Sequence, residues 1–395
     1  MDAIAQTRVR RYNPAVARST VDFSKLSRVL VIHLRQYGDV LLTSPVFSAL
    51  KKHARHLEID ALVYDHTAEM LTLHPAIAQV HRLRRRRDVS FAARMEEELR
   101  LLRRLRVRRY DVLINLGPHP SAVWLNWILR PRYHVAPQKG GFFARLWSMN
   151  FTHVLRFTVN RHQAEMNLDA LRLFGLFPGE EERRLVLVPG EDAEAAARKR
   201  MAAAGLSPGG FVIVHAPSNW SFKCMPAERA ARLVERLVKD GERVVLTAAP
   251  AAGDLALTRA IRDGCGVDVV DFSGELSLKE LAALIGQAKL VIAVDSAPVH
   301  IASAMQTPVV AIFGPSNECQ WGPWRVPHRV VGSHLHRCRP CNNAGCGGSK
   351  ISDCLVTLPV ESILAAAKEL MAERVNGLAS GDRLERYVPR AAGRI

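Results

Sequence analysis

Hydrophobic positions along the chain alternate between short runs rich in β-branched residues and longer segments with a helical repeat. Strand-like runs occur at 29–33, 57–63 and 110–115, and helix-compatible segments occur at 45–53 and 89–106. In the second of these helical segments, one face carries Phe91, Met95, Leu99 and Leu102. This alternation of strands and helices predicts a mostly parallel sheet covered on both sides.

The same alternation begins again after a break at Pro189 and Gly190. A helix is expected over 191–204, and strands are expected over 211–215, 243–247, 267–271, 290–294 and 308–313. We therefore predict an α/β fold with two Rossmann-like lobes, 25–188 and 189–370, and a ligand cleft between their strand carboxyl ends. Residues 1–24 and 371–395 are expected to be a basic extension and a basic tail, whose first part could extend a helix over 360–373.

The composition narrows the class of protein. A chain of 395 residues with 48% hydrophobic content is long enough for two buried cores. Residues 1–25 lack the apolar stretch of a signal peptide, and no segment has the roughly 18 apolar residues of a membrane span, so a cytoplasmic location is expected. The formal charge of +17 favours a polyanionic partner, which could be nucleic acid, an anionic membrane or a phosphorylated substrate.

Two segments of the first lobe combine cations with possible membrane contact. The arginine run at 82–87, continued by further arginines over 100–109, is either a solvated face or a surface drawn to an anionic membrane. The segment 140–147 mixes aromatic residues with cations, and it either enters the membrane interface or packs in an ordinary way.

A helix start after the strand at 290–294 is a candidate site for a diphosphate. Asp295 ends the strand, Ser296 can cap the next helix, and Pro298 suits its first turn. The free amides of such a helix start, with the positive end of the helix dipole, bind anions, and His300 could reach the same anion. The alternative is a well-capped helix whose Asp and His only satisfy backbone groups.

Two further polar segments follow strands. Lys223 lies in the loop 216–226 with Ser218 and Asn219, where it is either a solvated lysine or a cation that neutralises a leaving diphosphate. Asp39 follows the first strand and should face the cleft. It is either a helix-capping residue or a general base for an acceptor hydroxyl.

Together, GDVLLTSPVFSALKK at 38–52, the loop SNWSFKC at 218–224, and DSAPVHIASA at 295–304 followed by FGPS at 313–316 resemble the ADP-heptose:lipopolysaccharide heptosyltransferases of glycosyltransferase family 9. The resemblance covers about residues 25–370, and the FKC loop and the cysteine-rich stretch look most like the heptosyltransferase III branch. It implies a GT-B fold and an inverting transfer of heptose from ADP-heptose to the lipopolysaccharide inner core. The partners would be ADP-heptose, this phosphorylated glycolipid and an anionic membrane surface, with peripheral association at the inner membrane.

The resemblance also implies roles for individual residues. Asp39 would be the general base and Lys223 the cation that stabilises the diphosphate. The donor would be bound by Ser218, Asn219, Leu276, Asp295, Ser296, Ala297 and His300, with Asp254 as a weaker match for a ribose contact. Two positions depart from the family pattern: Ala297 replaces a common Gly, and Met225 replaces a frequent Trp.

Four cysteines near the C-terminus form a group with one C-x-x-C unit. Four thiolates can hold zinc tetrahedrally, but this spacing is not that of a ribbon with two C-x-x-C units, so reduced structural thiols or disulfides are alternatives. The residues are Cys338, Cys341, Cys346 and Cys354. No cofactor is expected for the reaction, because no paired carboxylate of the DxD type occurs in a suitable loop.

Two other classes fit less well. A nucleic-acid-binding protein agrees with the charge, but the chain lacks a recognisable reading motif and a stacking surface, so no nucleic-acid partner is expected. Another nucleotide-sugar enzyme, such as an epimerase or a dehydrogenase, remains an alternative. The dehydrogenase is disfavoured because neither first strand is followed by G-x-G-x-x-G.

Overall fold

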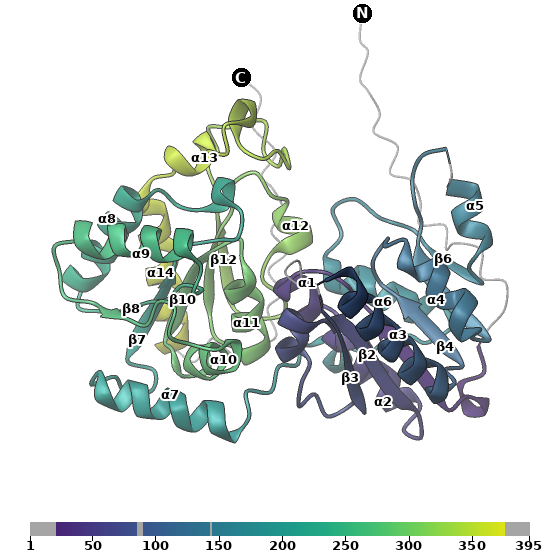
Figure 1. The fold of residues 1–395 in the computed structure, drawn as a ribbon. Coiled ribbons are helices and arrows are strands. Elements are labelled where there is room, and N and C mark those ends of the chain that lie inside the picture. The colour runs from purple at the N-terminus through teal and green to yellow at the C-terminus, as the bar shows by residue number, and fades with distance from the viewer. Residues whose placement is uncertain (1–20, 85–89, 143, 376–395) are drawn as a thin grey trace, which may run out of the picture.

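The computed structural model describes residues 21–84, 90–142 and 144–375. Within these residues, twelve strands form two six-stranded sheets, ordered β3-β2-β1-β4-β5-β6 and β12-β11-β10-β7-β8-β9 (Figure 1). Each pair of neighbouring strands runs parallel. The strands are β1 Arg28–Ile32, β2 Glu58–Tyr64, β3 Gln79–Leu83, β4 Val112–Asn115, β5 Tyr133–Pro137, β6 His153–Leu155, β7 Phe211–His215, β8 Arg243–Leu246, β9 Val270–Asp271, β10 Leu290–Val294, β11 Val309–Ile312 and β12 His328–Val331.

Helices cover both faces of each sheet. The first lobe has η1 Phe23–Lys25, α1 Tyr37–Leu41, α2 Ser44–His53, η2 Asp65–Met70, α3 Phe91–Arg108, α4 Ser121–Leu129, α5 Ala144–Met149, α6 Gln163–Leu173 and η3 Glu181–Arg183. The second has α7 Glu191–Ala203, η4 Ser221–Lys223, α8 Ala227–Lys239, α9 Ala252–Gly264, α10 Leu278–Gln287, α11 Ala297–Met305, α12 Glu318–Trp321, η5 Cys346–Gly348, α13 Asp353–Val356 and α14 Val360–Val375.

Strand periodicity decides which helix packs on which face. In β1, Val29 and Val31 belong to the cluster with α2 and α6, whereas Leu30 and Ile32 belong to the cluster with α3 and α4. This is the two-residue repeat of a strand buried on both sides. Such burial explains why the central strands are continuous apolar runs, and it confirms the predicted α/β class with two Rossmann-like sheets.

The two lobes share one hydrophobic cluster. That cluster joins residues of α1, α2 and α6 to residues of α10 and α11, and α1 contacts α11 directly. A second contact stacks His162 on Trp324 with ring centroids 4.3 Å apart, and the Trp324 indole N–H donates to the Arg183 carbonyl at 2.7 Å. The lobes therefore meet through two separate groups of contacts.

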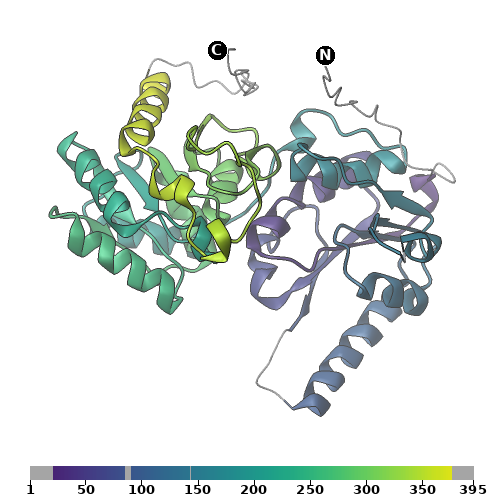
Figure 2. The same ribbon diagram turned by 90° about the horizontal axis from the view of Figure 1, so that it is seen from above.

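The apolar face expected for α3 is only partly correct: Leu102 packs against the core, but Met95 and Leu99 do not. Met95 is 41% exposed and Leu99 is 46% exposed, whereas Leu101 and Leu105 are buried against the sheet. Figure 2 shows that α3 extends outward from the first lobe, so its N-terminal half has little to pack against. The strands β3, β5, β6 and β12 were also missed by the pattern, because β3, β6 and β12 are edge strands, β5 lies next to an edge, and all four are short.

No helix among the described residues is both long and apolar enough to cross a bilayer. Most of the expected basic extension at 1–24 and most of the tail at 371–395 lie outside the described residues, as do Arg85, Arg86 and Arg87.

Candidate active site

The first lobe contributes Asp39, which lies in the first turn of α1 directly after β1. Burial raises the pKa of its carboxyl, while the Arg35 and Lys223 charges partly oppose this rise. The charges of Lys223 and Asp295, from the other lobe, both act on the carboxyl, so Asp39 faces the second lobe. A half-buried carboxylate with a raised pKa is a stronger base than an exposed one.

The second lobe contributes Lys223 from the loop after β7. Its ammonium group donates to the Asp295 carboxylate at 2.7 Å, and the two side chains are 22% and 7% exposed. The Ser218 hydroxyl donates to the Asp295 carbonyl at 3.4 Å, which ties this loop to the end of β10. The loop and the strand end therefore form one polar unit.

The helix start at α11 differs in detail from the expectation. Ser296 is the N-cap residue, but its hydroxyl donates to the Val294 carbonyl at 3.0 Å and accepts no helix N–H. The expected side-chain cap is therefore wrong. Pro298 does stand in the first turn, and Ala297 begins the helix. With no side-chain cap, the amides at this end are available to an anionic ligand.

His300 lies where the lobes touch. A Cβ placed on Gly38 would come within 2.6 Å of the His300 ring, so the absence of a side chain at Gly38 allows this contact. Burial lowers the pKa of His300 to about 4, and its Nδ1 has no hydrogen-bond partner among the described residues. His300 is therefore neutral at neutral pH, and its ring fills the contact between α1 and α11.

Three other predicted donor residues are less tightly connected. Asn219 is exposed, and Leu276 is half-buried in the turn before α10. Within the described chain, no side-chain hydrogen bond joins Asn219 or Leu276 to the Lys223–Asp295 pair. Asp254 lies in the first turn of α9. Burial raises the pKa of the Cys224 thiol, and the Asp254 charge adds to this rise, so Asp254 lies near the loop of Lys223.

Sequence reasoning missed two buried ionisable residues, one of which links the two lobes. Lys279 is buried, and its ammonium group donates to the carbonyl of Thr72 in the first lobe at 2.9 Å and to that of Val188 between the lobes. His33 ends the run VLVIH, is buried, and has no partner for either ring nitrogen among the described residues. A histidine ending an apolar strand was the available signal for His33. No sequence feature around Lys279 indicates that it links the lobes.

The four cysteines come together in space. Cys338, Cys341, Cys346 and Cys354 line one cavity of about 150 Å³, together with His336, and their thiols are free. Among the described residues, no three His, Cys, Asp or Glu side chains are grouped closely enough to hold a metal ion. The cysteine loop, defined as residues 333–354, also supports the loop of Lys223: the Ser352 hydroxyl donates to the Phe222 carbonyl at 2.6 Å.

A cavity of about 510 Å³ lies in the first lobe and not between the lobes. It is lined mainly by leucines of α3 together with residues of α4 such as Trp124 and Ile128. Because it lacks the Lys223–Asp295 pair and any helix start of the second lobe, it does not correspond to the predicted donor site.

Two parallel Rossmann-like sheets with a polar group between their lobes define the class of protein. The structure is similar to that of a family 9 glycosyl transferase from Veillonella parvula, with a TM-score of 0.74, 22% identity, and coverage of 88% of this chain and 97% of that one. It is also similar to the E. coli heptosyltransferase WaaC with ADP, with a TM-score of 0.67, 18% identity, and coverage of 87% and 99%. The fold is GT-B.

The sequence comparisons identify the family. The family model described as glycosyltransferase family 9 (heptosyltransferase) matches residues 98–351. Lipopolysaccharide heptosyltransferase 3 of Escherichia coli K12 is 30% identical over 341 residues, which cover 86% of this chain and 97% of the relative. The chain belongs to glycosyltransferase family 9 and is a glycosyltransferase, as its resemblance to that family predicted.

Proposed function

We propose that this protein is an inverting heptosyltransferase that moves heptose from ADP-heptose to a hydroxyl of the lipopolysaccharide inner core, as a heptosyltransferase III. The observation that carries the proposal is the contact between the lobes beside Asp39: the neighbouring Gly38 lies against His300 of α11, and the charges of Lys223 and Asp295 act on the Asp39 carboxyl. The similarity to lipopolysaccharide heptosyltransferase 3 over 97% of that relative supports the same acceptor class.

The proposed mechanism is a single displacement. The Asp39 carboxylate takes the proton of the acceptor hydroxyl, whose oxygen attacks the anomeric carbon while the bond to the diphosphate breaks on the opposite face. Lys223 and the amides at the start of α11 stabilise the negative charge that ADP carries away. Asp295 holds Lys223 in place before the donor binds, since their ion pair is 2.7 Å long and largely buried.

Donor binding is proposed to involve the second lobe alone. Ser296, Ala297 and His300 would contact the diphosphate end, while Ser218 and Asn219 would contact polar groups of the donor. Leu276 would approach the adenine, and Asp254 the ribose. The half-buried position of Leu276 and the closeness of Asp254 to Cys224 are compatible with these roles.

No divalent metal is proposed for the transfer, because Lys223 and the amides at the start of α11 would neutralise the diphosphate, and the chain has no DxD-type carboxylate pair in a suitable loop. The enzyme is proposed to be cytoplasmic and peripherally associated with the inner membrane, where its glycolipid acceptor lies. The +17 formal charge supports an anionic membrane surface as a partner.

Replacement of the proposed base tests the mechanism. Asp39→Asn keeps the size of the side chain but removes the proton acceptor, so we expect turnover to fall by about 10²-fold or more while ADP binds as before. Turnover is measured with ADP-heptose and a heptose-deficient core oligosaccharide, with product stereochemistry determined by NMR. Asp65→Asn, on η2 of the same lobe, is the matched control. Normal turnover in Asp39→Asn would exclude Asp39 as the base, and no transfer from ADP-heptose by the wild type would exclude the proposed reaction.

A further inference from the structure

Large apolar side chains gather on the outer side of the first lobe. Trp124 and Trp127 of α4, Phe142 before α5, and Leu146 and Met149 of α5 are all at least 59% exposed. We call these five residues the α4–α5 surface. Several large apolar side chains exposed in one region of a protein often mark an interaction site.

The two helices of this surface are fixed side by side. The Trp127 indole N–H donates to the Asn150 side-chain oxygen at 3.3 Å, and the rings of Trp124 and Trp127 lie 6.2 Å apart. Underneath, Trp147 and Phe151 are buried with Ala122. Within the segment 140–147, Trp147 is therefore packed in the protein interior, whereas the side chains of Phe142 and Leu146 are exposed.

The exposed charged side chains around this surface are all positive. Residues 112–164 contain no Asp or Glu. None of the five exposed cations in this stretch forms an ion pair within the described chain; they are Arg130, Arg132, Lys139, Arg145 and Arg156. Lys139 lies over the Trp147 ring at 5.0 Å, and Arg132 lies 5.3 Å from the Tyr133 ring. Trp, Phe and unpaired cations together are the composition of a membrane–water interface contact.

Three arginines on α3 or directly after β3 differ in this respect. Arg84 pairs with Glu97, Arg100 pairs with Glu96, and Arg108 pairs with Asp60 at 2.9 Å. Part of their charge is therefore neutralised by the protein itself. The α4–α5 surface, with its unpaired cations and exposed aromatic residues, is the better match for anionic lipid.

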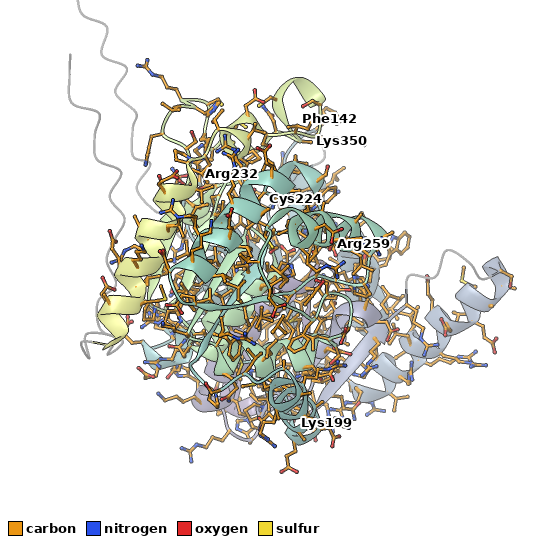
Figure 3. The ribbon with its side chains drawn as sticks, turned by 90° about the vertical axis from the view of Figure 1, so that its left-hand side faces the viewer. Phe142, Lys199, Cys224, Arg232, Arg259 and Lys350 are labelled. Carbon is orange, nitrogen blue, oxygen red and sulfur yellow. The ribbon has the colours of Figure 1, made fainter. Side chains whose placement is uncertain are left out.

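This surface adjoins the edge of the sheet that carries Asp39. Because all strands of the first sheet run parallel, the segments after β5 and β6 leave the sheet at the same edge as α1 after β1. Lys139 and Phe142 follow β5, and Arg156 follows β6. In Figure 3, Phe142 lies toward the same end of the molecule as Cys224, the residue that follows Lys223 in the chain. Lys199 lies at the opposite end.

We propose that the α4–α5 surface docks this protein onto an anionic lipid bilayer, with the five cations against headgroup phosphates and the apolar side chains in the interface. The proposal rests on the proposed membrane-embedded acceptor and specifies how the enzyme meets it. A second copy of the chain is a poorer occupant, because a two-fold interface would set this acid-free surface against itself.

Flotation of the full chain with vesicles tests the proposal. Vesicles are made of phosphatidylcholine, with or without phosphatidylglycerol, and contain no lipopolysaccharide. We expect binding only with phosphatidylglycerol, and weaker binding at high salt. The triple variant Arg130→Gln/Arg132→Gln/Arg145→Gln should bind about 100-fold more weakly, since each cation near the surface is worth roughly fivefold. Trp124→Gln/Leu146→Gln should also weaken binding.

Two matched triple variants locate the contact. Arg103→Gln/Arg104→Gln/Arg106→Gln changes exposed arginines of α3, and Arg198→Gln/Lys199→Gln/Arg232→Gln changes exposed cations of the second lobe. Both should retain most of the binding. Equal losses in all three triple variants, a larger loss in the α3 variant, or no binding by the wild type would overturn the proposal. The proposal would also be overturned if the wild type were a dimer in solution and Trp124→Gln/Leu146→Gln made it a monomer without changing its vesicle binding.

Turnover with a deacylated, water-soluble acceptor separates this proposal from the proposed reaction. The α4–α5 variants should transfer heptose to it at the wild-type rate, because the substitutions are outside the cleft. Loss of turnover in these variants would mean a structural defect, and the surface would then not be a docking site. Vesicle binding by a wild-type protein that transfers no heptose would overturn the reaction but leave the docking proposal supported.

Discussion

At the scale of single residues, the ion pair of Lys223 and Asp295 is the most informative feature. A largely buried ion pair is costly to desolvate and often adds little net stability, so its presence suggests a further role. Here the lysine lies beside a helix start that carries no side-chain cap, so an incoming diphosphate would find a cation and free amides together. The sequence motifs alone placed these groups after separate strands.

Lys223→Met should weaken ADP binding by about 10- to 100-fold, because a hydrogen bond to a charged group contributes roughly 1.5–3 kcal/mol. Adenosine should bind nearly as it does to the wild type, because it has no diphosphate. Calorimetry with both ligands measures the difference. Lys239→Met, an exposed lysine of α8, is the control. Equal losses for ADP and adenosine would show that Lys223 does not contact the diphosphate.

His33 predicts a pH dependence of stability. Burial lowers its pKa to about 3 in the folded protein, from an ordinary value of 6.5. Between these values the unfolded chain binds the extra proton, so the free energy of unfolding contributed by His33 is fully present above pH 6.5 and is lost as the pH falls. The slope is about 1.4 kcal/mol per pH unit for one proton.

His33→Leu should therefore flatten the decline of stability between pH 6.5 and 5. Urea unfolding of the wild type and the variant at several pH values measures the two slopes. His334→Leu changes an exposed histidine and should leave the slope as in the wild type. Identical slopes for wild type and His33→Leu would mean that His33 does not titrate as its burial requires.

At the scale of elements, the cysteine loop is a support for the loop of Lys223. It is linked to that loop by the bond from Ser352 to the Phe222 carbonyl and by a bond of 3.4 Å from the Ser221 hydroxyl to the Lys350 carbonyl. Its four thiols line one cavity but differ in burial: Cys354 is buried, and Cys338 and Cys346 are exposed. Packed thiols and a structural zinc ion therefore predict different mutational patterns.

We expect packed thiols, so that the effect of Cys→Ser follows burial. Cys354→Ser should destabilise the protein by about 1–3 kcal/mol, and Cys338→Ser and Cys346→Ser by much less. Chemical unfolding measures the three changes. Elemental analysis of protein prepared without a metal-affinity step is the complementary measurement. One zinc per chain, with similar losses for all four cysteines and a lower Tm after chelation, would establish the zinc site instead.

At the scale of the whole molecule, the relative position of the lobes depends on the contact between Gly38 and His300. A side chain at residue 38 would meet a buried imidazole at 2.6 Å, and that ring has little room to move. Because Asp39 is the next residue, a displacement here changes the distance between the proposed base and the donor groups.

Gly38→Ala should lower turnover by about 10- to 100-fold, since a displacement of the order of 1 Å between reacting groups has an effect of this size. ADP affinity should fall less than turnover, because His300 is the one proposed donor-binding residue known to contact residue 38. Steady-state kinetics and ADP titration measure both quantities. Gly253→Ala, at a helical position with open space around it, is the matched control and should be neutral. Wild-type turnover in Gly38→Ala would show that the lobe contact does not position Asp39.

Much of the fold and part of the site followed from local pattern. The apolar runs at β1, β7 and β10 predicted strands because these strands are buried on both faces, and each is followed by one member of the candidate site. Since parallel strands have their carboxyl ends at one edge, Lys223 and Asp295 could be placed together before the structure was known. The face of α3 could not be predicted, because the helix extends beyond the sheet that it packs on.

By itself, the sequence determined the two-lobed α/β organisation, the family motifs and the residues that follow the central strands, because these depend on short-range periodicity. Only the tertiary structure decided that Gly38 contacts His300, that Lys279 joins the lobes, that four separated cysteines line one cavity, and that the α4–α5 surface is exposed. The physical reason is that such contacts depend on where segments far apart in the chain meet, and no local pattern of hydrophobic and polar residues encodes that position.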